Sequence, residues 1–168
     1  MSSKKKQHAR RRAREDALSL LYSSDVMERD AVELVDEGLF PEDIELGDYA
    51  EMLVRGVVDH RAEIDERLAE TSENWSVDRM PVVDRALLRV AVFEMIYVED
   101  VPVSVAINEA VEIAKAYGGE DESSRFVNGV LGRIARSLGE SDAAPAVEAA
   151  SPATAKREPE GTEDDGTN

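Results

Sequence analysis

The sequence predicts an all-α protein of about seven helices. Apolar residues recur every three or four positions along most of the chain up to Gly139, which is the spacing of one face of a helix. No segment shows a convincing alternation of apolar and polar residues, the pattern of a half-buried strand. Aromatic residues make up only 5% of the 168 residues, so the core must be built from Leu, Val, Ile and Ala. Together these observations favour packed helices.

The first two helices are expected near the N-terminus. Residues 10–24 are expected to form one helix because small and apolar side chains repeat along one side of it, at Ala17, Leu20, Leu21 and Ser24. A short second helix is expected over residues 31–37. Gly38 and the loop before Pro41 end it.

A longer helical segment is expected over residues 48–71. Asp48 is a suitable N-cap, and apolar residues continue at helical spacing as far as Leu68. The sequence leaves open whether a bend near His60 divides this segment into two helices.

The next helix is expected to be the centre of the protein. Residues 82–98 are apolar nearly all the way round, which is typical of a buried helix, and Pro81 suits a first turn. Asp100 and Pro102 end this helix.

Two further helices complete the predicted fold. One has an apolar stripe over residues 107–114 and is stopped by the glycine pair at 118 and 119. The last has its apolar stripe over residues 127–138, is capped by the serine at 123 or 124, and is followed by Gly139.

Positive charge is concentrated at the N-terminus of an acidic chain. The net charge of −17 ordinarily argues against a nucleic-acid partner, because an acidic surface repels phosphate. Residues 1–14 nevertheless hold seven Lys and Arg side chains and no acidic one. This asymmetry indicates an interaction arm for an anionic partner; the alternative is a solubilising tail.

We therefore expect three regions: a flexible basic arm over residues 1–9, a folded helical domain over residues 10–139, and a disordered acidic tail over residues 140–168. The last region has almost no large apolar residue with which to offset the entropy of ordering. The chain has no secretory signal and no apolar run long enough to span a membrane, so we expect a cytoplasmic protein.

Few residues suggest catalysis. The chain has no cysteine, its two histidines lack partners at ligand spacing, and its carboxylates are spread over solvated helix faces. The glycines at 118 and 119 are not followed by the Lys-Ser/Thr pair of a phosphate-binding loop. We therefore expect no enzyme activity, no catalytic residue, no metal site and no cofactor.

The first helix holds the strongest physical signal. On a helical period, Arg11, Arg14, Leu18 and Tyr22 fall on one face. An exposed ridge of guanidinium groups with an aromatic ring beyond it suits single-stranded RNA, because arginines bind phosphates and a ring stacks on an unpaired base. The alternative is that Tyr22 is half-buried and the arginines pair with acidic residues of neighbouring helices.

A second candidate is Phe126, for which a place in the core is the default.

Three stretches of the chain resemble the NusB family in order and spacing. They cover nearly the whole expected folded domain and read RRRAREDALSLLYS at residues 10–23, VDRALLRVAVFEM at 83–95, and VAINEAVEIAKAYGGED at 105–121 followed by RFVNGVLGRIA at 125–135.

The resemblance implies a fold of two small packed helical bundles. It also implies a transcription antitermination factor that binds the boxA element of nascent, chiefly ribosomal, RNA together with NusE, a small-subunit ribosomal protein. The expected partners are single-stranded RNA, NusE and the transcription elongation complex, with no membrane and with a homodimer left open.

The resemblance also assigns site residues. It makes Arg10, Arg11, Arg12 and Arg14 the phosphate-binding arm, and Tyr22 and Phe126 part of the RNA surface. Asp121 borders that surface, although Glu122 is the alternative because the segment before Arg125 is about one residue longer than the family pattern. A weaker expectation places Asp84 and Arg89 in contact with RNA or NusE.

Two other functions are compared with this one. A NusB-like domain also begins some RNA cytosine methyltransferases, but these need a catalytic cysteine, which this chain lacks. The remaining alternative is a protein-binding helical adaptor without specific RNA binding.

Overall fold

A computed structural model of the chain describes residues 2–72, 76–117 and 121–139. In these ranges it contains seven α-helices, one short 3-10 turn and no strand, so the predicted all-α class is confirmed. The helices are α1 (Ser3–Met27), α2 (Ala31–Asp36), α3 (Asp48–Asp59), α4 (Arg61–Thr71), α5 (Val82–Tyr97), α6 (Val103–Tyr117) and α7 (Asp121–Ser137), with the turn η1 (Val77–Arg79) before α5.

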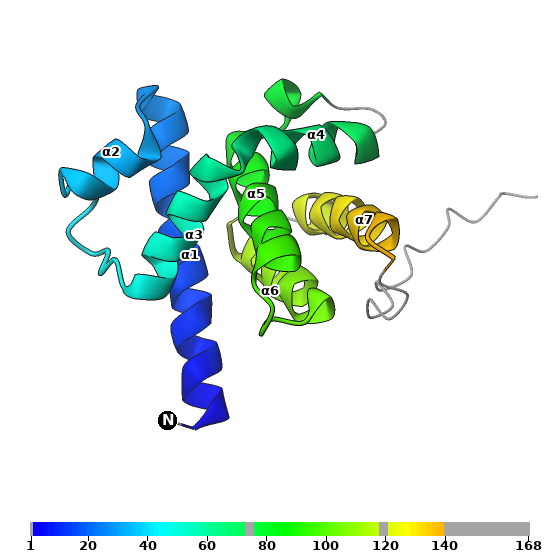
Figure 1. The fold of residues 1–168 in the computed structure, drawn as a ribbon, viewed down its shortest axis with the longest axis horizontal. Coiled ribbons are helices and arrows are strands. Elements are labelled where there is room, and N and C mark those ends of the chain that lie inside the picture. Colours follow the sequence, from blue (N-terminus) through cyan, green and yellow to red (C-terminus); the bar gives the residue numbers. More distant parts are fainter. Residues whose placement is uncertain (1, 73–75, 118–120, 140–168) are drawn as a thin grey trace, which may run out of the picture.

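Helices α1 to α3 form one group and α4 to α7 form a second (Figure 1). Helix α5 is the member of the second group that packs against α1 and α3 of the first. Helix α1 packs on α2, α3 and α5, while α6 packs on α5 and α7. The two groups share one apolar core, which is built mainly from Leu, Val, Ile and Ala side chains, as the composition predicted.

Helix α1 is longer at both ends than predicted. The Ser2 hydroxyl accepts a hydrogen bond from the Lys5 amide, and the helix then continues to Met27, where Glu28 takes up a left-handed conformation with φ 53°. This corrects the predicted start at residue 10: residues 3–9, expected to be a flexible arm, are helical. These N-terminal turns project beyond the other helices (Figure 1).

The segment predicted over residues 48–71 is two helices. Helix α3 ends at Asp59 and α4 begins at Arg61, and His60 between them lies outside the helical conformation with φ −110° and ψ 16°. The N-cap of α3 is Gly47, one residue before the predicted Asp48. The question that the sequence left open is therefore settled in favour of a bend at His60.

Helix α5 is the central helix that the sequence predicted. Most of its side chains are buried, and it packs on α1, α3, α4, α6 and α7. Three of the buried side chains are charged, namely Asp84, Arg89 and Glu94. Because unpaired buried charges are costly, each of them needs a partner on another helix.

Helix α7 begins at Asp121, before the serines that were predicted to cap it. The glycine pair expected to stop α6 and the expected acidic tail over residues 140–168 lie outside the described residues. None of the described helices combines the length and the apolar character needed to cross a membrane.

Candidate nucleic-acid interface

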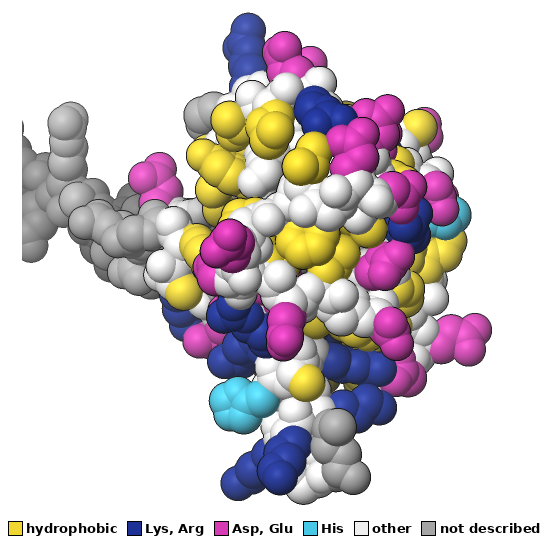
Figure 2. Space-filling model, turned by 90° about the vertical axis from the view of Figure 1, so that its left-hand side faces the viewer, with side chains coloured by type: hydrophobic (Ala, Val, Ile, Leu, Met, Phe, Trp, Pro, Cys, Tyr) yellow, Lys and Arg dark blue, Asp and Glu magenta, His cyan; other side chains and the backbone are white. Residues whose placement is uncertain are grey.

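The N-terminal turns of α1 form a projecting basic surface. Lys4, Lys5 and Lys6 are exposed, as is His8 one turn later, and the first turn contains no acidic residue. Lys and Arg side chains gather over this end of the molecule (Figure 2). Cations at a helix N-terminus are unfavourable next to the positive end of the helix dipole, so a bound anion would stabilise this end of the helix.

The next two arginines are held by carboxylates of the second helical group. One Nη atom of Arg10 lies 2.6 Å from Asp100, in the connection between α5 and α6, and this contact holds the pKa of Asp100 below its usual value. Arg11 donates from Nε and Nη2 to the two oxygens of Glu109 on α6, at 2.7 and 3.1 Å. These hydrogen bonds raise the pKa of Arg11. The alternative in which arginines pair with neighbouring helices is therefore confirmed here.

Arg12 points away from this pair of contacts. Its Nη2 donates to the backbone carbonyl of Asp43 at 3.1 Å, and its Nε lies 3.2 Å from the carboxylate of Asp16. Its side chain keeps a relative exposure of 61%, so it is the most accessible of the four predicted arginines.

Arg14 is not on an exposed ridge. Only 4% of the residue is exposed, because α3 and α5 cover it. Its Nε and Nη2 donate to the two oxygens of Glu94 at 2.6 and 2.8 Å, and the Tyr49 hydroxyl donates to Glu94 at 2.9 Å. This burial corrects the prediction that Arg14 binds phosphate: its charged group is satisfied inside the protein.

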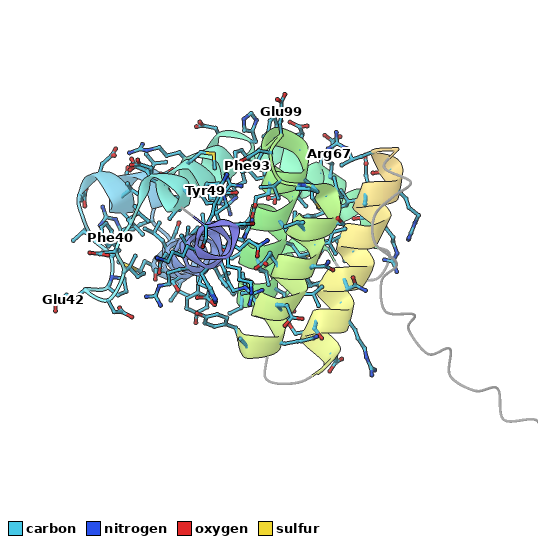
Figure 3. The ribbon with its side chains drawn as sticks, turned by 90° about the horizontal axis from the view of Figure 1, so that it is seen from below. Phe40, Glu42, Tyr49, Arg67, Phe93 and Glu99 are labelled. Carbon is cyan, nitrogen blue, oxygen red and sulfur yellow. The ribbon has the colours of Figure 1, made fainter. Side chains whose placement is uncertain are left out.

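Tyr49 closes this buried group from the side of α3 (Figure 3). Its ring also lies under the guanidinium of Arg10, with 4.6 Å between the guanidinium carbon and the ring centroid, a cation–π distance. Burial raises the pKa of the Tyr49 hydroxyl, which therefore stays protonated and remains a hydrogen-bond donor to Glu94. The three side chains of Arg14, Glu94 and Tyr49 fix α1 against α3 and α5.

Tyr22 is exposed, as predicted, with 41% of the residue accessible. On a regular helix Arg11 and Tyr22 lie on nearly the same face, about 16 Å apart along the axis. Leu18 between them is 2% exposed, so the predicted continuous ridge is interrupted by packing. This face of α1 therefore has a basic end, at Arg11 and the turns before it, and an aromatic end at Tyr22.

Asp84 and Arg89 are buried rather than placed on a surface. Asp84 accepts a hydrogen bond from Ser123 at the start of α7, and it is 6% exposed. Arg89 is 5% exposed and pairs with Asp65 at 2.8 Å and with Asp25 at 3.4 Å. The expectation that these two side chains contact RNA or a partner directly is corrected: they join α5 to α1, α4 and α7.

Phe126 is half-buried and packs against the core, so the default core assignment is borne out in part. Glu122 in the same helix is exposed, whereas the side chain of Asp121 lies outside the described part of the chain. The predicted RNA contacts of Phe126 and Asp121 stay predictions.

One feature of this surface is not among those predicted from the sequence. Lys4, Gln7, His8 and Arg11 line a shallow depression of about 290 Å³ together with Glu109. The signal was available, because Ser2 is a good N-cap and no Gly or Pro interrupts residues 3–27. The basic run was instead interpreted from its charge alone as a flexible arm.

The comparisons with known proteins, by sequence and by structure, lead to one and the same family. Residues 11–136 match the model of the NusB family. A relative from Nocardioides sp., described as transcription antitermination protein NusB, is 47% identical over 128 residues, which cover 76% of this chain and 94% of the relative.

Solved structures agree with this match. A solved structure described as T. maritima NusB has a TM-score of 0.67 and 35% identity, and the match covers 76% of this chain and 90% of that one. A structure described as antitermination factors NusB and NusE in complex with dsRNA has a TM-score of 0.63 and 28% identity, with 76% and 96% covered.

Proposed function

The chain belongs to the NusB family, and from this membership we propose that it is a transcription antitermination factor that binds the boxA element of single-stranded RNA. The observation that carries the proposal is the face of α1 that has a projecting basic end and exposes Tyr22 about three turns beyond Arg11. A phosphate chain suits the basic end, and an unpaired base suits the ring.

The proposed contacts differ from those expected from the sequence, because the buried Arg14, Asp84 and Arg89 are left out and the exposed lysines of the first turn are added. We assign phosphate binding to Arg10, Arg11 and Arg12, joined by the lysines of the first turn, and base contacts to Tyr22 and Phe126. Arg14 acts as a positioning residue, because its buried pairing with Glu94 fixes the helix that carries the others. Asp121 is proposed to border the RNA.

We further propose that the RNA is bound jointly with NusE, within the transcription elongation complex. The support is a structural neighbour whose description names NusB and NusE in complex with dsRNA, so it supports joint RNA binding and leaves the single-stranded form to the test. A second protein would enlarge the RNA surface, which is useful here because Lys6, Arg10 and Arg11 are already paired with carboxylates.

The test is the binding of a labelled boxA RNA and of a scrambled RNA, with and without NusE. Selective binding that tightens with NusE supports the proposal. Tyr22→Ala should weaken boxA binding by about 1–3 kcal/mol, or roughly 5- to 150-fold, through lost stacking. The matched control is Tyr22→Phe, which keeps the ring and should bind nearly as well as the wild type.

A salt titration tests the electrostatic part separately. If three phosphates are neutralised, log affinity against log salt should have a slope of about −2 for single-stranded RNA. Equal binding of both RNAs, unchanged by NusE and by Tyr22→Ala, would instead favour the protein-binding adaptor with a nonspecific basic helix.

A further inference from the structure

We propose that Asp100 and Glu109 compete with RNA phosphates for Arg10 and Arg11, so that RNA binding exchanges two carboxylates for phosphates. The two acidic side chains come from the second helical group and occupy the arginines when no RNA is present. This inference rests on the proposed function and describes how the same surface is regulated.

The geometry at Arg11 carries the inference furthest. Glu109 takes both Nε and Nη2 of the guanidinium, at 2.7 and 3.1 Å. The two N–H groups on this edge of an arginine also match two oxygens of a phosphate. A phosphate therefore cannot use that edge of Arg11 until Glu109 leaves it.

Each displaced carboxylate has a second cation within reach. Glu109 lies 3.9 Å from Nη1 of Arg14, and Asp100 lies 3.6 Å from Nζ of Lys6. Because leaving a charge without a partner is the main cost of breaking an ion pair, these secondary contacts make the exchange cheap. A displaced Glu109 can stay near Arg14, and a displaced Asp100 can keep Lys6 where the RNA leaves that lysine free.

Burial separates the exchangeable pairs from the fixed one. The side chains of Arg11 and Asp100 are 42% and 55% exposed and those of their partners Glu109 and Arg10 are 16% and 21% exposed, so each pair is partly accessible to water and to a ligand. The side chains of Arg14 and Glu94 are 5% and 1% exposed, and Tyr49 holds the same carboxylate. The exchange is therefore confined to the projecting end of α1, and the anchor beneath it is retained.

The consequence is that part of the positive charge of this surface is cancelled in the free protein. Lys6, Arg10 and Arg11 face Asp100 and Glu109, so most of their charge is cancelled in the free protein. A phosphate chain that contacts several cations at once can displace both carboxylates, whereas one small anion gains too little.

The experiment compares three charge-neutralising variants of the full chain in binding a labelled single-stranded boxA RNA. Glu109→Gln and Asp100→Asn should each bind the RNA about two- to fivefold more tightly, the range expected for releasing a solvent-accessible ion pair. The matched control is Asp36→Asn, which removes the same charge from an exposed pair with Arg55 in the first helical group. This control measures the effect of net charge alone.

A double variant tests whether the gain passes through the arginine. Arg11→Gln combined with Glu109→Gln should lose the gain of Glu109→Gln, since the released guanidinium is then absent. If Glu109→Gln and Asp100→Asn bind no more tightly than Asp36→Asn, or bind more weakly, the carboxylates position the arginines and the inference is wrong. If the wild type does not bind the RNA at all, the proposed function fails, and the inference fails with it.

Discussion

Neutralising Glu94 should destabilise the protein more than neutralising any exposed carboxylate. Glu94 is 1% exposed and Arg14 is 4% exposed, and two hydrogen bonds of 2.6 and 2.8 Å join them. Glu94→Gln keeps the shape of the side chain but leaves the buried Arg14 guanidinium with only Glu109, 3.9 Å from its Nη1, as a counter-charge. Removing one member of such a buried pair costs about 3–5 kcal/mol.

This loss is large compared with the stability of a domain of this size. Because domains unfold with about 5–15 kcal/mol, Glu94→Gln should remove a substantial part of the free energy of unfolding. The assay is urea unfolding followed by circular dichroism. We expect a lower midpoint with an unchanged dependence on urea concentration, because the surface exposed on unfolding stays the same.

Two further variants make the result interpretable. Arg14→Met together with Glu94→Gln removes the uncompensated cation and should recover most of the lost stability, because apolar replacements of buried pairs are often tolerated. Asp36→Asn, in an exposed pair, should change the midpoint little. If Glu94→Gln costs no more than Asp36→Asn, the buried pair does not anchor α1, and our account of Arg14 is refuted.

Three other predictions concern stability. Gly56→Ala would place a Cβ atom 2.1 Å from the Phe93 ring and should lower the free energy of unfolding in urea by about 1–3 kcal/mol. Gly129→Ala, in open space on α7, should raise the free energy of unfolding by up to about 1 kcal/mol. Equal effects of the two variants would contradict the packing described. Asp30→Ala removes the N-cap of α2 and should cost about 1 kcal/mol, and an unchanged midpoint would contradict this role. Burial raises the pKa of Asp84, so the stability linked to its protonated form is lost as pH rises. Asp84→Asn should therefore have a higher melting temperature than the wild type at pH 7, and the difference should shrink towards pH 4. A difference that grows on acidification would contradict this prediction.

The helices could be predicted because their signals are local. The apolar stripe of α6 and the all-round apolar surface of α5 depend only on neighbours along the chain, and both helices lie where the sequence placed them. Errors at helix ends arose where several local signals compete. Ser123 is a good capping residue, yet its hydroxyl contacts Asp84, 39 residues away, and α7 begins earlier.

The site was harder to predict, because exposure depends on which helices meet. Periodicity correctly places Arg11 and Arg14 on neighbouring positions of α1, but it contains no information on the carboxylates that meet them 98 and 80 residues away. The flanking residues differ, with Arg10 and Arg12 beside Arg11 and with Ala13 and Glu15 beside Arg14, but they do not indicate which arginine another helix covers. Tyr22 is exposed, as expected, although Asp25 one turn further along α1 still pairs with Arg85 and Arg89 of α5, so the exposure of Tyr22 depends on its face of the helix and not on its distance along it.

The division of α1 into a buried and a projecting part has a functional consequence. Arg14, Leu18 and the turns that follow hold the helix in the core, so its direction is set by the fold rather than by a ligand. The basic turns before Arg10 are then presented at a constant angle, and phosphate binding there need not meet the cost of ordering a flexible arm. On this argument, a variant that weakens the Arg14 pairing should lose RNA affinity through the orientation of α1, even though Arg14 itself touches no RNA.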